Sequence, residues 1–494
     1  MRIIWVVSIC SANLYFNQMT QGRQVGLGEK LAYSMGGVAN FYMANLLPLL
    51  ALPIFSVGLG IDAWKVGLAM GLPRLWDALI DPYIGHLSDS LKSRWGRRRP
   101  FLLAGALIAL VTYSLLWLPT PAWGKDATFW WFLVWSFLYY TAFSIYSIPF
   151  IAIGYEIATD SKELAKLMTI RSFVSSIFSL LMPWVYAMCF WNWTALQESG
   201  SLSGRLAALI VSPDGKALHP PGYQIVGILL AVFMAVAGCL ALFCREKPRV
   251  AAPNKHDFRK SMGVAFRNRP FIILSGSLVF AMVGIFLIMP LSTYVNIYHI
   301  YAGDQAKAAA MLAKVGSIQA IVGIAFVPVA GYIISRFGAA RMMKLFLLCT
   351  AVSFASKYWT YTPANPWLQL APLTLWSIGW AGTMLTFNVM LGDVCDYDEY
   401  TSGVRREGMY GAINQFLTKM GIFISTSLSG FVLSLSGIVA GAAEQTPRAV
   451  WLMRVEFSIV PFLIALAASC AFFFYPLTDK RANEIRDAIK ARKT

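Results

Sequence analysis

Charged residues are scarce in this chain, and its cysteines follow no metal-binding or redox spacing. Asp, Glu, Lys and Arg make up 13% of the 494 residues, hydrophobic residues make up 57%, and the mean hydropathy is +0.59. The seven cysteines form no C-x-x-C pair and mostly fall in apolar runs, so we interpret them as reduced core residues. No P-loop motif is present, which argues against ATP as an energy source. This composition excludes a soluble protein of two or three domains.

Long apolar runs recur along the whole sequence and determine the predicted fold class. Each run has about 20 residues, enough for an α-helix to cross a hydrocarbon core of about 30 Å. We therefore predict an all-α membrane protein with twelve transmembrane helices in two six-helix bundles. The predicted helices lie near residues 31–57, 64–87, 101–119, 128–153, 167–189, 223–244, 271–297, 310–335, 343–361, 367–391, 409–435 and 451–475.

The positive charge lies between the apolar runs. The formal net charge is +17, and the excess of Lys and Arg is concentrated in loops and in the C-terminal tail. This is the positive-inside pattern of membrane proteins, and it argues against a nucleic-acid partner. Since the densest basic run, 85–100, must then be cytoplasmic, an even number of spans places both termini in the cytoplasm.

A charged linker divides the chain into two halves. The first 18 residues resemble a weak signal peptide without a good cleavage site, so Met19 is an alternative start. We predict an N-terminal segment (1–29), a six-helix bundle (30–244), a cytoplasmic linker (245–270), a second six-helix bundle (271–476) and a basic cytoplasmic tail (477–494).

Short motifs repeat between the two halves. The segment 85–97 has a weaker echo in 331–341, and Gly154-Tyr-Glu156 has an echo in Gly392-Asp393. Parallel six-helix repeats are typical of transporters that bind their solute between the halves, near the membrane midplane.

Three ionisable residues interrupt the second apolar run. Arg74, Asp77 and Asp81 fall on one face of the predicted helix. Because an isolated charge at the membrane centre costs roughly 2.5–3.5 kcal/mol, these side chains must face a protein interior or an aqueous cavity. Two carboxylates one turn apart can hold a small cation or share a proton. The alternative is an Arg–Asp pair that locks two helices, which explains one aspartate but not both.

Several motifs, in the same order, resemble one known family. The two bundles, the basic linker and the run Asp89–Arg98 resemble the major facilitator superfamily. Within it, the chain resembles the glycoside–pentoside–hexuronide:cation symporters (melibiose-permease-like transporters), from about Lys30 to the end of the last predicted helix. The motifs that carry the resemblance are Arg74-Leu-Trp-Asp77-x3-Asp81-Pro82, Arg94-Trp-Gly96-Arg97, Ile148-Pro149-Phe150, Asp393-Val-Cys-Asp396-Tyr-Asp398-Glu-Tyr400 with Arg405 and Glu407, and Lys419.

The resemblance implies cation-coupled uptake of a sugar or sugar-like solute. In this family, acids of the second helix bind the coupling Na⁺, H⁺ or Li⁺, a role that would fall on Asp77 and Asp81. A basic residue early in the fifth helix helps to bind sugar and corresponds to Arg171. The lysine of the eleventh helix, Lys419, links the solute site to the cation. No cofactor other than the coupling ion is expected.

At the implied solute site, this chain departs from the family. The sugar-binding acid of the first helix corresponds to Phe41, beside Asn40, and the aromatic residue that stacks on sugar corresponds to Ile151. With fewer acids to balance Arg171 and Lys419, we hypothesise an anionic solute such as a hexuronide. The alternative for Arg171 is that it only extends to the cytoplasmic membrane surface.

At the implied cation site, the departures favour H⁺ over Na⁺. The family's asparagine that favours Na⁺ is replaced by Ile80 in this chain, and the family's acid of the fourth helix is replaced by Ser147. The family's hydroxyl near the cation is retained as Ser144. Hard cations such as Na⁺ need several oxygen ligands. A proton needs only one carboxylate whose neutral form is favoured by burial. Na⁺ coupling stays open as the alternative.

Charged residues near the cytoplasmic loops are predicted to act as gates. We expect ion pairs that hold the cytoplasmic side closed in one state, with a purely solvated loop as the alternative. The predicted gating residues are Asp89, Arg94, Arg97, Arg98, Asp393, Asp396 and Arg405. The run Asp396-Tyr397-Asp398 also matches the acidic pair of many glycosyltransferases. A membrane enzyme is a remote alternative, because no nucleotide-binding βαβ segment accompanies the pair.

The sequence therefore predicts a secondary transporter of the cell inner membrane that works by alternating access. Its expected partners are a small-molecule solute (a sugar, glycoside or hexuronide), a coupling cation and the lipid bilayer, and we expect a monomer. The runner-up is the same fold moving another amphipathic solute, such as a peptidoglycan fragment or a lipid-like acid. The predicted site residues are Asp77, Asp81, Ser144 and Ser147 for the cation, Arg74 and Lys419 for charge balance, and Asn40, Phe41, Arg171, Ile151 and Asn388 for the solute.

Overall fold

Helices are the regular elements of the described part of the chain. The computed structural model describes residues 25–91, 93–157, 161–191, 222–246, 263, 265–403 and 406–493, so the alternative start Met19, residues 247–262 of the predicted linker and Arg405 lie outside the described residues. The first half contains α2 (Leu27–Ala51) with the π-helical η1 (Leu52–Gly58), α3 (Ala63–Ser90), α4 (Arg99–Leu116), η2 (Pro121–Trp123), α5 (Lys125–Ile157), α6 (Ser161–Ser179) with α7 (Trp184–Met188), and α10 (Tyr223–Leu240) with η3 (Ala241–Phe243). The second half contains α12 (Arg269–Tyr294) with η4 (Val295–Ile300), α13 (Gln305–Phe337), α14 (Ala339–Thr360), η5 (Pro366–Gln369), α15 (Leu370–Ser402), α16 (Glu407–Leu435), α17 (Pro447–Phe473) and α18 (Asp479–Lys493).

Most of these helices are suited to a membrane. Within the described residues, 10 helical segments are long and apolar enough to cross a bilayer. The helices α3 and α15 have 28 and 33 residues but are more polar, and they complete two groups of six. The predicted all-α membrane fold is therefore confirmed.

Two helices differ from their predicted course. The predicted helix 167–189 is broken into α6 and α7, because Pro183 has no N–H to donate to Ser179. The helix α15 extends through the acidic run to Ser402 and ends at Gly403, whose φ of 73° is in the left-handed region that glycine adopts readily. The basic tail, for which no structure was predicted, contains α18.

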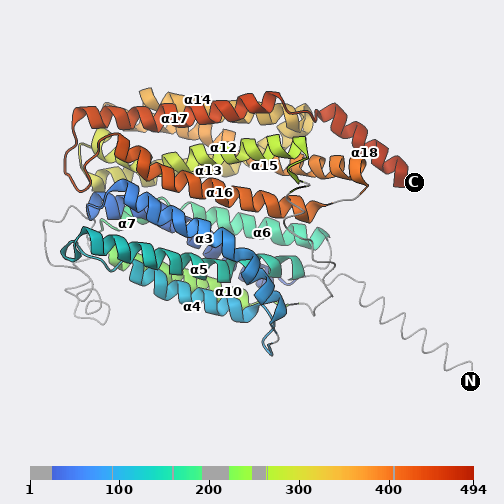
Figure 1. Cartoon of the computed structure of the whole chain (residues 1–494), viewed down its shortest axis with the longest axis horizontal. Coiled ribbons are helices and arrows are strands. Elements are labelled where there is room, and N and C mark those ends of the chain that lie inside the picture. Colours follow the sequence, from blue (N-terminus) through green and yellow to red (C-terminus); the bar gives the residue numbers. More distant parts are fainter. Residues whose placement is uncertain are drawn as a thin grey trace, which may run out of the picture.

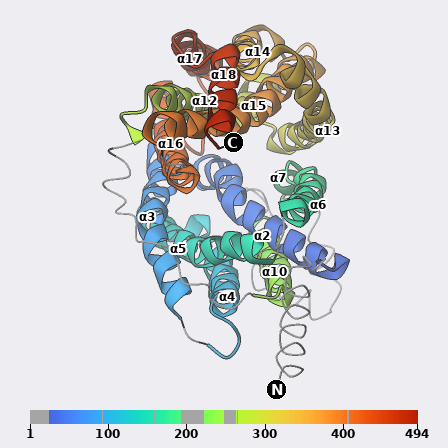
Figure 2. The ribbon, with the colours of Figure 1, turned by 90° about the vertical axis from the view of Figure 1, so that its right-hand side faces the viewer.

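The two halves lie side by side along the helices. Figure 1 shows the first half (blue to green) below the second half (yellow-green to red), and Figure 2 looks along the helices toward the end that carries α18. We call that end, with the turn 93–98, the basic end. The end with the turns 60–62 and 437–441 is the opposite end.

Apolar packing joins the halves at the opposite end. The larger core contains residues of α2, η1 and α5 together with second-half residues near the opposite end, including Tyr294, Ala308 and Leu433. A second core, which includes Phe346 and Ile485, lies in the second half toward the basic end. The two halves therefore share a core at the opposite end, whereas the second half has its own core at the basic end.

The helices α3 and α16 approach each other closely at the opposite end. A Cβ atom on Gly67 would lie 3.0 Å from the Cα atom of Gly430, and one on Gly430 would overlap the carbonyl oxygen of Ala63. On α7, the indole Nε1 of Trp184 donates to Ser317 Oγ of α13 at 2.9 Å. These contacts require small or well-fitted side chains where the halves meet.

We predict that Gly430→Ala destabilises the protein by about 1–3 kcal/mol, because the added methyl group must push α16 away from α3. The matched control is Gly411→Ala on the same helix, since no atom lies within 4 Å of its Cβ position, and it should be neutral or slightly stabilising. Thermal unfolding of both variants in detergent measures the difference. Equal melting temperatures in Gly430→Ala and the parent protein would contradict this close packing.

Candidate functional site

Asp77 and Asp81 of α3 point toward α5 and α16, and Arg74 points toward α2 and α5. Asp77 is fully buried, and the side chains of Arg74 and Asp81 are 8% and 18% exposed. Their spacing predicted a shared face, and the structure places that face inside the protein. The two carboxylates therefore lie at the boundary between the first half and α16 of the second half.

Lys419 of α16 bridges the two carboxylates. Its ammonium nitrogen lies 3.0 Å from Asp77 Oδ2 and also contacts Asp81 Oδ2. Its side chain is 22% exposed. The ammonium group of one half thus holds a position that a cation could take between two acids of the other half.

Ser144 of α5 completes the oxygen cluster. Its hydroxyl lies 2.9 Å from Asp81 Oδ1 and also contacts Asp77 Oδ1. A serine hydroxyl has one proton, so it can donate to only one of these carboxylates at a time. Ser147, the other predicted cation ligand, is buried on the same helix, 6% exposed.

Arg74 is held by aromatic rings as well as by charge. Its Nη1 atom lies 3.9 Å from Asp77 Oδ2. Its guanidinium carbon lies 4.2 Å from the ring centre of Tyr140 and 5.6 Å from that of Phe143. Such cation–π contacts contribute about 0.5–2 kcal/mol each. The two rings therefore stabilise a buried cation that the sequence predicted only as a charge-balancing group.

Arg74 also bonds to the backbone of α2. Its Nη2 atom donates to the carbonyl oxygen of Ala44. Pro48, four residues later in α2, has no N–H and cannot donate to that carbonyl as an ordinary residue would. Arg74 supplies the missing donor and thereby joins α2 to the charged face of α3.

Arg171 points into the first half rather than toward the membrane surface. The helix α6 begins at Ser161, earlier than predicted, so Arg171 lies nearly three turns inside it. Its guanidinium carbon lies 5.8 Å from the ring centre of Tyr33 and 5.5 Å from that of Phe150. Its side chain crosses α2 at Gly37, and a Cβ atom added to Gly37 would lie 3.0 Å from Nε of Arg171. This position favours a role at an interior site.

The other predicted solute residues have different surroundings. Asn40 of α2 is half-buried, and its enclosed Oδ1 atom has no hydrogen-bond partner among the described residues. Phe41 packs edge-on against Tyr42, with ring centres 6.0 Å apart. Ile151 is 36% exposed on α5. Asn388 is exposed, and its Nδ2 atom donates to Met384 of its own helix at 2.8 Å.

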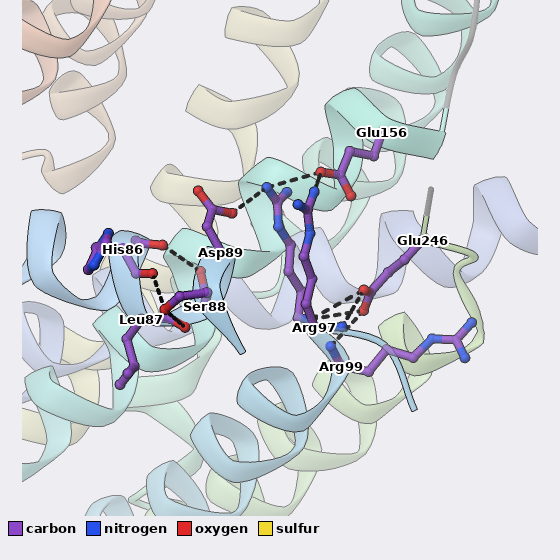
Figure 3. Close-up of polar contacts among 11 residues, drawn as sticks. His86, Leu87, Ser88, Asp89, Arg97, Arg99, Glu156 and Glu246 are labelled. Carbon is purple, nitrogen blue, oxygen red and sulfur yellow. Dashed lines mark hydrogen bonds and ion pairs between the residues drawn. The ribbon is translucent and has the colours of Figure 1, made fainter. Parts of the chain in front are cut away.

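At the basic end, three predicted gating residues form one network in the first half (Figure 3). Arg98 Nη2 lies 2.9 Å from Asp89 Oδ1 and 3.0 Å from Glu156 Oε1, and Arg97 contacts the same oxygen of Glu156. Arg94 is exposed in the adjoining turn. These contacts connect the end of α3 and the start of α4 to the end of α5.

A remote carboxylate caps the first turn of α4. Glu246 accepts backbone N–H bonds from Arg97, Arg98 and Arg99 at 2.8, 3.1 and 2.7 Å (Figure 3). In the second half, Asp479 accepts from the backbone N–H of Ala340 near the start of α14 at 2.9 Å. Each half thus uses an acid that follows its sixth helix to neutralise the positive end of its third helix.

In the second half, α18 supplies the partners of the predicted gating acids. Arg486 contacts Asp393, and its Nε atom lies 3.4 Å from Asp396 Oδ2. Asp398 pairs with Arg406 at 3.0 Å. In the described part of the chain, the ion pairs that the structure gives at the basic end join residues of the same half. A gate between the halves at this end stays a prediction.

Sequence reasoning missed the groups that hold these charges in place. Glu246 and Arg486 act across more than 90 residues of sequence, and no local spacing connects them to their partners. Pro48 inside a predicted helix was a usable signal, since a proline in a helix leaves a carbonyl without its donor. Tyr140 lies in an aromatic run that gives no indication of which ring faces Arg74.

Comparisons with known proteins agree on one family. The family model described as MFS/sugar transport protein matches residues 32–479. The chain is 26% identical to the glucuronide carrier protein homolog of Escherichia coli (strain K12) over 475 residues, which covers 94% of this chain and 95% of that one. It is 24% identical to the isoprimeverose transporter of Lactiplantibacillus pentosus over 471 residues, covering 93% and 90% of the two chains.

The fold also matches solved structures. The crystal structure of a bacterial homolog of the human lysosomal transporter Spinster, in an inward-facing and unoccupied conformation, superposes with a TM-score of 0.67 at 15% identity. The match covers 92% of this chain and 97% of that chain. At this identity, the likeness concerns the fold alone.

We predict that Lys419→Met destabilises the protein by roughly 3–5 kcal/mol, because it leaves two carboxylates without their ammonium partner. The deficit should shrink as the pH is lowered, since protonation of a carboxylate removes the uncompensated charge. Lys65→Met is the matched control: Lys65 is 26% exposed but pairs at 3.4 Å with Asp126, which is 86% exposed, so its loss should cost less than about 1 kcal/mol. Melting temperatures across pH test this. A deficit in Lys419→Met that is the same at every pH would contradict the assignment.

Proposed function

The chain belongs to the MFS/sugar transport protein family, as its motifs predicted, and we propose that it imports a sugar-like solute together with a proton. The family assignment makes it a transporter and not an enzyme, so the glycosyltransferase alternative is not retained. Asp396 and Asp398, on which that alternative depended, are paired with Arg486 and Arg406.

One observation carries the coupling proposal: Lys419 of the second half binds Asp77 and Asp81 of the first half. With Arg74, the cluster holds two positive and two negative charges. A further cation would leave an excess positive charge at membrane depth unless Lys419 withdrew, and such an excess is costly. Loading the cation therefore releases the second half from the acids of the first half, which couples ion binding to movement of the halves.

The oxygen atoms around Lys419 favour a proton as the coupling ion. Ser144 contacts one oxygen of each carboxylate but can donate to only one of them. If one carboxyl group is protonated, it can donate to the Ser144 oxygen while Ser144 donates to the other carboxylate. At position 80, the isoleucine contributes no side-chain oxygen that would help to complete a Na⁺ shell.

The solute that fits best is an anionic sugar. Arg171 and the enclosed amide oxygen of Asn40 lie on the helices α6 and α2 of the first half. A guanidinium group supplies a fork of donors that matches a carboxylate, and an amide oxygen accepts a sugar hydroxyl. The similarity to a glucuronide carrier homolog supports this choice. The similarity to an isoprimeverose transporter supports a neutral glycoside as the second candidate.

We also propose the cell inner membrane as the location, with both termini cytoplasmic and a monomer as the working unit. The concentration of basic residues in the loops at one end supports this orientation. In this arrangement, the basic end is cytoplasmic, and the halves are joined on the external side.

We predict that Asp81→Asn abolishes uphill accumulation of solute but retains exchange, because the variant can bind solute without carrying a proton. Uptake into membrane vesicles, with a pH gradient and a Na⁺ gradient imposed separately, measures this. Asp62→Asn, at the start of the same helix and 3.7 Å from Lys65, is the control and should accumulate solute normally. Full gradient-driven accumulation by Asp81→Asn would exclude the coupling role.

We predict that Arg171→Gln reduces uptake of labelled glucuronide by at least tenfold while Arg171→Lys retains part of it, because lysine keeps the charge but not the fork of donors. An uncharged methyl glycoside serves as the comparison solute, and its uptake should change less. Glucuronide uptake that Arg171→Gln leaves unchanged would overturn the anionic-solute proposal while leaving the coupling proposal standing.

A further inference from the structure

An apolar groove lies between α12 and α16 near the basic end. Its volume is about 180 Å³. Figure 2 shows α12 and α16 side by side at the left edge of the molecule. Three large side chains at the groove, Phe266, Ile272 and Phe280, are 45%, 42% and 52% exposed. The other residues that line it are Phe271, Ser275, Gly276, Val279 and Leu417.

The groove is built on a fixed part of the fold. Asn268 caps α12 through the N–H of Phe271 at 3.2 Å, and its amide donates to the hydroxyl of Tyr410 on α16 at 2.8 Å. The rings of Phe271 and Tyr410 pack with their centres 4.8 Å apart. These contacts hold α12 and α16 together at the basic end of the groove. They leave an opening further along the helices, beside Gly276, where no atom lies within 4 Å of the Cβ position.

The polar groups along the groove are spaced in the same order as the polar groups of a phospholipid. Arg267 follows Phe266 directly and is exposed, as is Arg269, the first residue of α12. Ser275 lines the groove about two turns further along, and its enclosed hydroxyl has no hydrogen-bond partner among the described residues. A phosphate near the arginines, an ester oxygen near Ser275 and an acyl chain beyond it follow the order of groups along a lipid.

We propose that this groove binds one anionic phospholipid of the bilayer. Its acyl chain lies against Gly276, Val279 and Phe280, its ester group lies at the level of Ser275, and its phosphate is held by Arg267 and Arg269. The positive charge at the end of the groove selects an anionic headgroup, since each basic residue at the surface contributes to binding of anionic lipid.

The lipid contacts α16, the helix that carries Lys419. Leu417 lines the groove two residues before Lys419 on α16. An acyl chain packed against Leu417 restricts movement of this part of α16 away from α12. Occupancy of the groove is therefore linked to the position of the ammonium group between Asp77 and Asp81.

Binding is measured by native mass spectrometry on delipidated full-length protein in detergent, titrated with dioleoyl phosphatidylglycerol or dioleoyl phosphatidylcholine. We expect one phosphatidylglycerol to bind more tightly than phosphatidylcholine. Replacing both arginines (Arg267→Gln with Arg269→Gln) should weaken phosphatidylglycerol binding by about fivefold for each arginine. The control Arg341→Gln removes another exposed arginine near the start of a helix, α14, and should bind as the parent protein does.

A second variant tests the groove itself. Gly276→Leu fills the open space beside the backbone and should remove binding of both lipids, whereas Gly408→Leu, at an equally open position on α16, should retain it. Melting temperatures confirm that each variant is folded.

The proposal is overturned if either test variant binds phosphatidylglycerol as the parent does. Loss of binding in Gly276→Leu alone would mean that the groove holds a lipid without regard to headgroup charge. Loss in the arginine variant alone would mean a surface site away from the groove.

Discussion

The structure depends on one ammonium group placed between two carboxylates where the two halves meet. Each of these charges alone would cost roughly 2.5–3.5 kcal/mol at membrane depth. Together, Arg74, Asp77, Asp81 and Lys419 carry no net charge, so the cluster is tolerated as a unit. Because Lys419 belongs to α16 and the acids belong to α3, this neutrality holds only while the halves stay in contact at this level. An ion that replaces the ammonium group of Lys419 between the two acids removes the need for this contact between the halves.

The position of Arg74 shows how a helix irregularity stabilises the cluster. Pro48 leaves the Ala44 carbonyl without a donor, and an unsatisfied buried carbonyl is itself unfavourable. Arg74 satisfies that carbonyl while two aromatic rings cover its guanidinium face. The arginine is therefore fixed by α2 and α5 and lies 3.9 Å from Asp77 Oδ2, the same oxygen that Lys419 contacts at 3.0 Å, so both cations offset the charge of that acid.

Much of this architecture was predictable, because membrane helices and buried acids have strong local signals. The spacing of Arg74, Asp77 and Asp81 predicted their shared face, and the family resemblance implied that Lys419 links the cation site to the solute site. Other features depend on contacts between distant segments and have no local signal. Glu246 caps α4 from beyond the sixth helix, and Arg486 reaches Asp393 from a tail helix whose polar composition gave no reason to expect a docked element. Pro183 is a local signal for the break between α6 and α7, but the apolar run around it is long enough for one helix and was predicted as one.

The distribution of contacts determines which end of the molecule opens most easily. At the basic end, the ion pairs given by the structure lie within one half, as between Arg97 and Glu156 or between Arg486 and Asp393. Separating the halves there breaks none of these pairs. At the opposite end, separation must expose the shared apolar core and part the close contact of Gly67 with Gly430. Movement of the halves is therefore opposed by apolar packing and hydrogen bonds such as Trp184–Ser317 at one end and by the ion pairs of Lys419 in the middle. Of these contacts, only the ion pairs of Lys419 respond directly to a bound cation.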